Sequence, residues 1–397
     1  MNTIVFIGSG AKDYRYYILE EAKKLGLYVL LLNDQPLSWE SEYIDEYIKT
    51  DLTSEELITN ILRKHPNKIK GITTYVEGFV PITATICKRF NLVGLPPKAS
   101  MKVRNKYMMR KCFFNQNVPS PKVLNIQNTH DIENAGEKID FPVVFKPAEG
   151  WSSIGVVKIE NSKDLLYEYS QQSSLANEFL IEEYIEGPEF SVEGIVQGGE
   201  IHTVGVTQKY LSNEPYFEEV GHDFPATLSS EKFKEILRVA SKGVKALDID
   251  DAPFHAELRL TKKGPVVIEI AARLGGDCIP LLVNLSYGIN LARESIKLAI
   301  GEKLNITKVK NNYSSIRIIT PYKTGVIEKI PEPSQELKEN SNLIDFRVHS
   351  RCKVGEYYHT PPDGYFSRLG YFIMAGEGKD IYEKASQLGC QIQMKIK

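Results

Sequence analysis

Short apolar strands alternate with amphipathic helices over the first hundred residues, and this alternation constrains the fold more than any other feature. The β-branched run Thr3–Ile7 ends in glycine, and the helical pattern that follows ends at Gly26. A second apolar run over 27–32 and a third over 71–74 are each followed by a further helical pattern. Strands separated by helices of about a dozen residues predict a parallel sheet with right-handed crossovers. We therefore expect a Rossmann-like α/β domain over residues 1–95.

The Gly8-Ser9-Gly10 turn matches the start of a dinucleotide-binding fingerprint, which needs a third glycine at position 13. Asp13 occupies that position, so the pattern favours a tight strand-to-helix turn beside a ligand crevice. A nicotinamide or flavin enzyme is therefore not expected.

Prolines and glycines divide the remaining chain into four segments. A helical pattern ends at Asn117-Val-Pro-Ser-Pro121, because proline lacks an amide donor and restricts the residue before it. Three stretches containing short strands follow, with a late helical pattern near 379–387. We expect a helical bridge and three further segments, with boundaries at 96–117, 118–186, 187–310 and 311–397.

The composition argues against several classes of partner and compartment. With 49 basic and 51 acidic residues, the net charge of −2 offers no basic surface for nucleic acid or an anionic membrane. No apolar run reaches the roughly 20 residues that span a bilayer. The five cysteines are odd in number and widely spaced, which favours a reducing compartment over a disulfide framework or structural zinc. The start, MNTIVFIGSG, has no basic leader, so a cytoplasmic protein is expected.

A strand that ends in Lys146 runs into a loop rich in glycine and serine, and this segment is a candidate phosphate site. The loop contains Gly150, Ser152, Ser153 and Gly155. Backbone N–H groups at glycines and serine hydroxyls can approach an anion closely, and the lysine adds a fixed charge. The loop does not match G-x-x-x-x-G-K-[ST], which excludes a Walker-type NTPase. On its own, the lysine is better explained as a solvated residue at a strand end.

The segment Leu180-Ile-Glu-Glu-Tyr-Ile-Glu-Gly-Pro-Glu189 joins an apolar strand to an acidic connector and a Gly-Pro turn. Adenine needs a flat apolar slot with backbone or carboxylate partners at its edge, and a carboxylate a few residues later suits ribose hydroxyls. A charged hinge between domains explains this segment equally well.

Two predicted strands carry carboxylates twelve residues apart, about the length of a hairpin, at Glu257 and Glu269. Side by side they could hold hard cations, which prefer carboxylate oxygen. Like charges directly opposite are destabilising without a cation, so a metal site is favoured over a plain cross-strand pair. Arg273, just beyond, would direct a permanent cation at a bound phosphate. His255-Ala-Glu257 also matches the H-x-E of zinc deaminases, but no P-C-x-x-C follows.

In this order, the motifs resemble the ATP-grasp superfamily over essentially the whole chain. Gly221-His-Asp-Phe-Pro-Ala226 and Glu269-Ile-Ala-Ala-Arg-Leu-Gly-Gly-Asp277 resemble its carboxylate–amine ligases, particularly bacterial L-amino-acid ligases that make dipeptides. The resemblance implies an ATP-grasp fold, α/β and α+β in several domains. The Rossmann-like domain and the bridge would be followed by a lid subdomain over 118–186. A central antiparallel-sheet domain with the metal site would cover 187–310, and a C-terminal subdomain the rest.

The resemblance also implies roles for individual residues. The residues that would bind ATP are Lys106, Lys146, Ser152, Ser153, Gly155, Glu182, Glu183, Ile185 and Glu189. Glu257 and Glu269 would hold two Mg²⁺ ions, with Mn²⁺ as an alternative. Arg273 would stabilise the transferring phosphoryl group. Many relatives carry an asparagine two residues after the second glutamate, but here Ala271 leaves the second metal one oxygen short.

The implied reaction transfers the γ-phosphoryl group of ATP to a carboxylate, and an amine then displaces phosphate to form an amide. The candidate catalytic residues are Arg273, Lys146 and His222, although no residue is secure as the base. The amino-acid pocket is expected at His222, Arg273, Gly275, Gly276 and Asp277, with Glu77 less firmly placed. His222 is expected in a loop, where a buried structural histidine is nearly as good an explanation.

Three acidic residues near His222 could recognise a basic amino-acid side chain, and we call them the acidic set: Glu218, Glu219 and Asp223. A solvated acidic loop is the preferred explanation. Three arginines of the last segment would either complete the acceptor pocket or support the fold: Arg347, Arg351 and Arg368.

Three alternatives stay open beside an L-amino-acid ligase that acts on small-molecule amino acids. The acceptor could be a carrier protein or another amine, the enzyme could be a biotin-dependent carboxylase, or the chain could bind nucleotides without catalysis. Glu257, Glu269 and Arg273 together argue against the last, because a binder needs no phosphoryl-transfer arginine. ATP-grasp relatives are commonly dimers, so the resemblance implies a homodimer, while the residues themselves leave the oligomeric state open.

Overall fold

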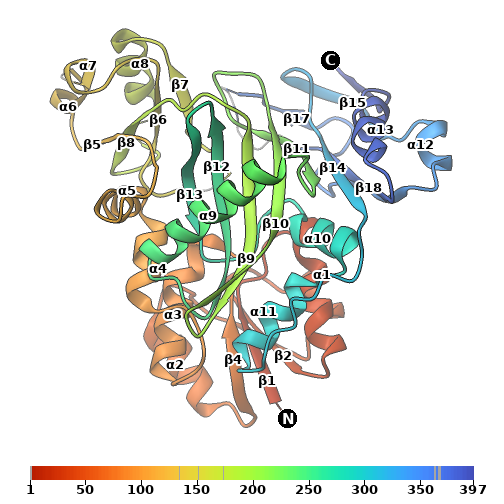
Figure 1. Ribbon diagram of the computed structural model, residues 1–397. Helices are drawn as coiled ribbons and strands as arrows, with labels where there is room; N and C mark the ends of the chain where they lie inside the picture. The colour runs from red at the N-terminus through yellow and green to blue at the C-terminus, as the bar shows by residue number, and fades with distance from the viewer. Residues whose placement is uncertain (1, 134, 151, 173, 362–363, 365–367) are drawn as a thin grey trace.

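The N-terminal domain is a four-stranded parallel sheet flanked by helices (Figure 1). The structure is a computed structural model that describes residues 2–133, 135–150, 152–172, 174–361, 364 and 368–397. The strand order is β3-β2-β1-β4, with bounds β1 (Asn2–Ile7), β2 (Tyr28–Asn33), β3 (Glu46–Lys49) and β4 (Lys68–Thr73). The helical elements are α1 (Lys12–Lys24), η1 (Trp39–Glu42), α2 (Glu55–Lys64), η2 (Glu77–Phe79) and α3 (Val80–Arg89). The predicted parallel sheet is confirmed.

Burial explains which strands of this domain were predictable. β1 and β2 are buried along almost their whole length, as expected for a parallel sheet covered on both faces. The edge strand β3, with the sequence EYIK, was not predicted. It is short, half-buried and flanked by charge, which is how sheets protect an edge and which also hides it from a hydrophobicity pattern.

A helical bridge leads to a small antiparallel lid. The bridge consists of α4 (Pro97–Arg104) and α5 (Lys106–Asn115). The lid strands, in the order β5-β8-β6-β7, are β5 (Val123–Ile126), β8 (Phe179–Glu183), β6 (Val143–Pro147) and β7 (Val157–Ile159). Its helices are α6 (Thr129–Glu133), α7 (Ala135–Lys138) and α8 (Ser162–Gln172). The lid has a hydrophobic core of its own, which includes Phe145, Leu165 and Phe179.

An eight-stranded antiparallel sheet forms the centre of the molecule. Its order is β13-β12-β9-β10-β11-β14-β18-β16, with bounds β9 (Glu189–Gln197), β10 (Glu200–Leu211), β11 (Glu219–Phe224), β12 (Ala252–Thr261), β13 (Gly264–Ala271), β14 (Tyr313–Ile319), β16 (Leu343–Val348) and β18 (Gly370–Gly376). The sheet continues across the expected boundary at 310–311, which falls between a helix and β14. The C-terminal segment therefore contributes three strands to the same sheet.

Helices and a second small sheet complete the fold. The helices are α9 (Ser230–Ala246), α10 (Ile279–Tyr287), α11 (Leu291–Ala299), α12 (Gln335–Glu339) and α13 (Asp380–Gly389). The small sheet pairs β15 (Gly325–Glu332) with β17 (Tyr357–Tyr358) and β19 (Gln393–Ile396). None of the helices among the described residues is both long and apolar enough to cross a bilayer.

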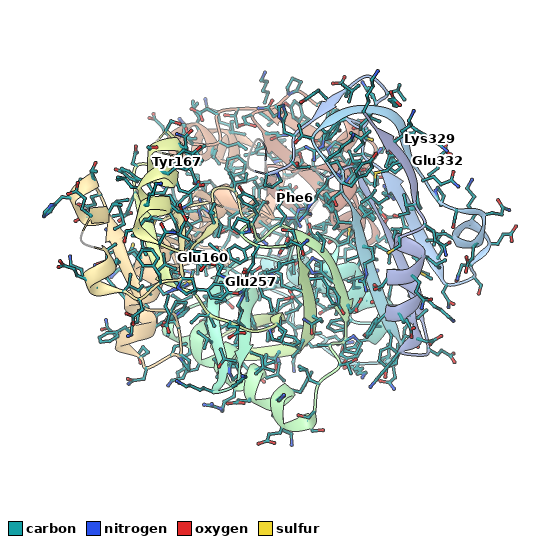
Figure 2. The ribbon with its side chains drawn as sticks, turned by 90° about the horizontal axis from the view of Figure 1, so that it is seen from above. Phe6, Glu160, Tyr167, Glu257, Lys329 and Glu332 are labelled. Carbon is teal, nitrogen blue, oxygen red and sulfur yellow. The ribbon has the colours of Figure 1, made fainter. Side chains whose placement is uncertain are left out.

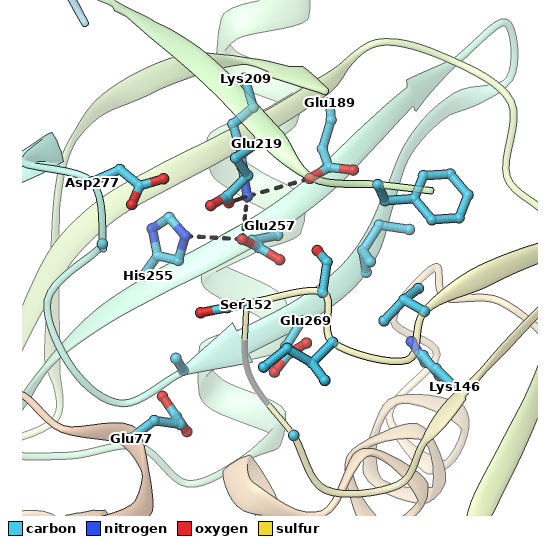
Figure 3. A pocket seen from close by; sticks show the side chains of 18 of the residues that line it. Glu77, Lys146, Ser152, Glu189, Lys209, Glu219, His255, Glu257, Glu269 and Asp277 are labelled. Carbon is cyan, nitrogen blue, oxygen red and sulfur yellow. Dashed lines mark hydrogen bonds and ion pairs between the residues drawn. The ribbon is translucent and has the colours of Figure 1, made fainter. Parts of the chain in front are cut away.

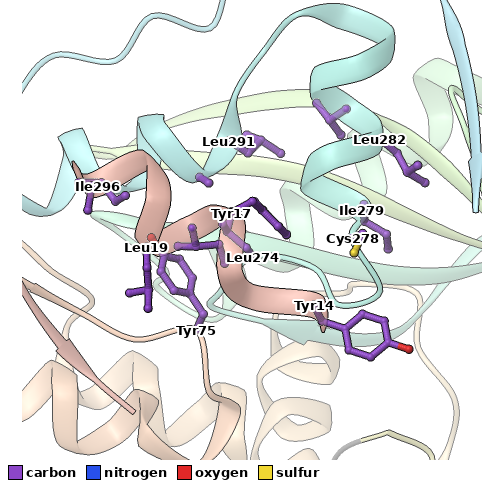
Figure 4. Close-up of a cluster of buried hydrophobic side chains, with 14 of the residues drawn as sticks. Tyr14, Tyr17, Leu19, Tyr75, Leu274, Cys278, Ile279, Leu282, Leu291 and Ile296 are labelled. Atoms are coloured by element: carbon purple, nitrogen blue, oxygen red, sulfur yellow. The ribbon is translucent and has the colours of Figure 1, made fainter. Parts of the chain in front are cut away.

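One hydrophobic core joins the N-terminal domain to the central sheet. Tyr14 and Tyr17 of α1 pack with Leu274, with Leu282 of α10 and with Leu291 of α11 (Figure 4). This cluster fixes the start of α1 against the loop that follows β13. Seen from above, Glu257 lies toward the middle of the molecule, between the lid and the C-terminal subdomain (Figure 2).

Candidate active site

A single cavity of about 690 Å³ collects most of the predicted site residues. Its walls come from the N-terminal domain, the bridge, the lid and the central sheet. The predicted residues that line it are Glu77, Lys106, Lys146, Ser152, Ser153, Glu182, Glu183, Ile185, Glu189, His222, Glu257, Glu269, Arg273, Gly276 and Asp277. Two predicted residues, Gly155 and Gly275, do not line it, because each packs against protein instead.

These two glycines are explained by the space around them. A Cβ on Gly155 would lie 2.7 Å from Oε1 of Gln172, and its φ of +74° favours glycine. A Cβ on Gly275 would lie 2.9 Å from Oε2 of Glu193 and 3.0 Å from Nδ1 of His255. Both glycines therefore allow close packing behind the cavity wall.

Glu257 and Glu269 are direct partners across β12 and β13, and the register slips just beyond them. His255 Nε2 lies 3.1 Å from Oε1 of Glu257, and Lys106 Nζ lies 3.1 Å from Oε1 of Glu269. Burial opposes ionisation of Glu257, but Lys209 and His255 outweigh it and hold the pKa of its carboxyl well below its usual range. The two side chains thus offer carboxylate oxygens at one place.

Lys209 of β10 is the cationic centre of this cluster (Figure 3). Its ammonium group contacts Glu257 and lies 2.6 Å from Glu219 and 3.3 Å from Glu189. Burial alone would lower its pKa, but the three carboxylates raise the pKa of Lys209 well above its ordinary value. Sequence reasoning missed this residue, because its role depends on the pairing of Lys209 with Glu189 across β10 and β9.

At the lid end of the cavity, Lys146 and Glu182 form a buried ion pair. Lys146 Nζ lies 2.6 Å from Oε2 of Glu182, and Arg110 Nε of α5 lies 2.9 Å from the other carboxylate oxygen. Burial opposes the charge of Glu182, yet Arg110 and Lys146 hold the pKa of its carboxyl below the ordinary value. Burial lowers the pKa of Lys146. The Glu182 carboxylate therefore anchors Lys146 and the bridge helix.

Arg259 of β12, also missed from the sequence, ties together two parts of the expected nucleotide site. Its Nη1 donates to the carbonyl oxygen of Ile185 at 2.9 Å, and its Nε donates to Glu189 at 3.2 Å. Its guanidinium lies over the ring of Phe217, 5.2 Å from the centroid. Apolar side chains line the same cavity: Val144, Val156, Leu211, Phe217 and Ile268. Through Arg259, which contacts both Phe217 and the carbonyl of Ile185, this apolar slot is joined to polar backbone.

The serine loop of the lid holds two consecutive residues in the left-handed region, Ser152 at φ +56° and Ser153 at φ +55°. Serine adopts this conformation at a cost, and such strain occurs preferentially where loops contact ligands. Both residues line the cavity.

Glu77 reaches the cavity from the N-terminal domain, at η2. Arg273 Nε donates to its Oε2 at 2.5 Å, and Arg104 Nη1 lies 3.4 Å from the other oxygen. Burial opposes the charge of Glu77, but Arg273 and Arg104 hold the pKa of its carboxyl below its ordinary value. In Figure 3, Glu77 lies on the opposite side of the view from Lys146.

The expectation that His222 lies in a loop is wrong. His222 is fully buried in strand β11, and its Nε2 lies 3.2 Å from Oδ2 of Asp277. Arg368, from the C-terminal segment, pairs with Asp277 and lies 3.2 Å from Glu219. Atoms of Glu219, His222 and Asp277 gather within 4.8 Å, as for a metal ion, but both carboxylates already pair with Arg368, and Glu219 also pairs with Lys209.

The preferred explanation of the acidic set as a solvated loop is also wrong for Glu219 and Asp223, which belong to strand β11, whereas Glu218 lies just before that strand. Asp223 is buried and pairs with Arg317 at 2.8 Å. Glu218 and Asp223 do not line the cavity, whereas Glu219 does.

Two family models match the chain: the ATP-grasp N-terminal domain at residues 19–94 and the ATP-grasp domain at residues 139–281. An alanine–anticapsin ligase of Bacillus subtilis is 27% identical over 87% of this chain and 82% of its own length. Carnosine synthase 1 of Mus musculus is 24% identical over 75% of this chain, but that match spans only 39% of the synthase.

Comparison with a solved structure also shows the ATP-grasp fold. The L-amino acid ligase from Bacillus licheniformis superposes with a TM-score of 0.87 at 25% identity, and the alignment covers 100% of this chain and 99% of that one. The lid, the central antiparallel sheet and the N-terminal domain are thus shared along the entire length. The chain belongs to the ATP-grasp superfamily and is similar to its L-amino acid ligases.

Proposed function

We propose that this chain is an ATP-dependent L-amino-acid ligase that joins two amino acids through an aminoacyl phosphate and releases ADP and phosphate. The observation that carries the proposal is the one cavity in which paired carboxylates, three lysines and Arg273 surround a shared space. Relatives named as ligases support the formation of an amide. The proposed setting is the cytoplasm, with small-molecule amino acids as substrates and a homodimer as the quaternary structure.

ATP would occupy the lid end of the cavity. The apolar slot suits adenine, with the backbone from Glu183 to Ile185 at its edge, and Glu189 would accept hydrogen bonds from the ribose. Lys106 and Lys146 provide fixed positive charge for the phosphates. Ser152, Ser153 and the backbone of the lid loop would close over the phosphates and exclude water from the acyl phosphate.

The carboxylates of Glu257 and Glu269 fit divalent metal ions, because they are hard oxygen donors in register on adjacent strands. The pair already attracts three cationic side chains, Lys209, His255 and Lys106. Glu257 and Glu269 would hold two Mg²⁺ ions, or Mn²⁺ in their place, and the bound metal would supply positive charge that stabilises the transferring phosphoryl group.

The remaining chemistry is positioning and charge stabilisation by the side chains of the cavity. Arg273 would bind the phosphoryl group as it moves from ATP to a donor carboxylate oxygen, while the β–γ P–O bond breaks and ADP leaves. The acceptor amine would then attack the acyl carbon, forming the amide and expelling phosphate. His222, held by Asp277, is the candidate to receive the proton that the ammonium group loses.

A basic amino acid as one substrate belongs to this proposal through Glu219, the member of the acidic set that lines the cavity. Its carboxylate already contacts Lys209 and Arg368, so a substrate cation would share it with them. A uniform preference for apolar amino acids would remove this part of the proposal.

The test is ATP-dependent phosphate release with the twenty L-amino acids, singly and in pairs, with the masses of the products recorded. Phosphate release that requires amino acids, with dipeptide masses, supports the proposal and names the substrates. The variant Arg273→Ala should lose both signals. Turnover only with bicarbonate, a carrier protein or another amine would instead favour those alternatives.

A further inference from the structure

Besides Arg259 and Arg273, a third arginine lines the cavity. Arg15, near the start of α1, lines the cavity together with Gly10 and Gly276. Its guanidinium makes one weak hydrogen bond, from Nη1 to the carbonyl oxygen of Gly275 at 3.5 Å. Over the part of the chain that the structure describes, no carboxylate forms an ion pair with it. Arg15 lies outside every motif that the sequence pattern singles out.

Arg15 differs in this respect from the other cationic side chains of the cavity. Each of them has a carboxylate within 3.3 Å: Lys106, Lys146, Lys209, Arg259 and Arg273. Burial lowers the pKa of Arg15 below its ordinary value, and the charge of Arg273 acts in the same direction, while Tyr17, Cys278 and Asp277 oppose this shift only in part. Two neighbouring guanidinium groups, one of which forms no ion pair with a carboxylate among the described residues, form a site that attracts an anion.

The fold holds Arg15 in place before any ligand arrives. The neighbouring side chains Tyr14 and Tyr17 anchor α1 in the core shared with α10 and α11 (Figure 4). Arg15 also passes over Gly10, since a Cβ at Gly10 would lie 3.3 Å from Cγ of Arg15 and 3.7 Å from a methyl group of Val76. The part of α1 that carries Arg15 is therefore fixed in the wall of the cavity.

A dipeptide-forming site needs two places for carboxylates. The donor carboxylate reacts, so it must lie beside the metal pair and Arg273. The acceptor keeps its own carboxylate, which is attached to the same carbon as the attacking amine. A site for it must therefore lie in the same cavity as the phosphoryl-transfer centre, and Arg15 enters that cavity from α1, a different element from the strands that carry Glu257 and Glu269.

We propose that Arg15 binds the α-carboxylate of the acceptor amino acid and so restricts acceptors to molecules with a free carboxylate. The assignment rests on the proposed ligase function. A guanidinium suits this role because its planar fork can donate two parallel hydrogen bonds to a carboxylate.

The test compares Arg15→Gln, Arg15→Lys and Lys12→Gln, the last a matched control that removes a charge from the exposed start of the same helix. Fragmentation of the product identifies the acceptor as the C-terminal residue. For Arg15→Gln, KM for the acceptor should rise about 10- to 100-fold, while KM for ATP and for the donor stays within about twofold. Arg15→Lys should recover part of this loss, and Lys12→Gln should match the wild type.

A second readout uses acceptors whose carboxylate is replaced by a carboxamide. The wild type should use the acid in preference to the amide by the same 10- to 100-fold factor, and Arg15→Gln should lose this preference. Dipeptide formation with unchanged acceptor KM in Arg15→Gln would overturn the Arg15 assignment alone, as would an equal rise in KM for donor and acceptor. A wild-type protein that forms no dipeptide from any pair would overturn the proposed function and the acceptor site with it.

Discussion

Two glutamate clusters in the same cavity are held in contrasting ways. Glu182 is only 3% exposed and lies between Lys146 and Arg110, which are equally buried. Glu257 and Glu269 face each other across two strands, and their side chains are 21% and 25% exposed toward the cavity. The first cluster is a closed ion pair with a surplus of positive charge, whereas the second leaves carboxylate oxygens open to a ligand.

Buried charged residues therefore have two different roles in this cavity. In the closed cluster the partners are fixed, so the charges connect the lid strands to the bridge helix. In the open cluster, lysine and histidine occupy positions that a metal ion or a phosphate could compete for. Glu182 thus serves the fold and holds Lys146 in place for the phosphates, whereas Glu257 and Glu269 would contact a ligand themselves.

The largest expected effect tests the closed cluster. Glu182→Gln leaves Lys146 and Arg110 without a buried counter-ion, and breaking such a pair costs about 3–5 kcal/mol of unfolding free energy. Urea denaturation measures this change. Glu231→Gln, an exposed glutamate at the start of α9, should change the unfolding free energy by less than about 0.5 kcal/mol. A similar small change in Glu182→Gln would show that the cluster is not structural.

The open cluster should respond in activity rather than in stability. Glu269→Gln removes one carboxylate oxygen from the proposed metal site, and ATP-dependent turnover should fall about 10²–10³-fold, as for the loss of one group that stabilises transition-state charge. Its melting temperature should stay close to that of the wild type. Full turnover in this variant would mean that Glu269 does not hold the metal.

Ligand binding should distinguish the clusters without any turnover. Mg²⁺ and ADP at about 100 times the dissociation constant should raise the unfolding free energy of the wild type by about 2.7 kcal/mol. EDTA should remove most of this gain, and Glu257→Gln should show a reduced gain in the presence of Mg²⁺. If EDTA leaves the gain unchanged, the metal does not contribute to nucleotide binding.

The smallest expected effect is a pH dependence that originates in the closed cluster. Because the pKa of Glu182 lies below its ordinary 4.5 in the folded chain, its contribution to stability is complete above that pH. The contribution is lost as the pH falls through the lower, folded value. The unfolding free energy of the wild type should therefore fall more steeply below about pH 4.5 than that of Glu182→Gln. Parallel curves would exclude Glu182 as the source.

Patterns in the sequence predicted the features of the fold and of the site that depend on residues close together along the chain. The alternation of strands and helices gave the N-terminal sheet, and the spacing of Glu257 and Glu269 gave their cross-strand pairing. The roles of Lys209, Arg259 and Arg15 were not predictable, because each depends on which distant strand or wall lies opposite.

Strand assignment failed for a related reason at His222 and Asp223. Their polar side chains indicated a loop, but the fold supplies each with a partner, Asp277 and Arg317 respectively. A buried polar residue is tolerated in a strand when a distant group satisfies it, and such a group is invisible to local patterns.

The separation of hydrophobic cores has a consequence for product release. The core around Tyr17, Leu282 and Leu291 spans the N-terminal domain and the central sheet, so any hinge between those parts would have to expose it to water. The lid packs around its own core at Phe145, so a movement of the lid would leave most of that core intact. For the proposed ligase, we therefore expect substrates and products to pass the serine loop, and we expect the attachment of the lid to set how often the cavity opens.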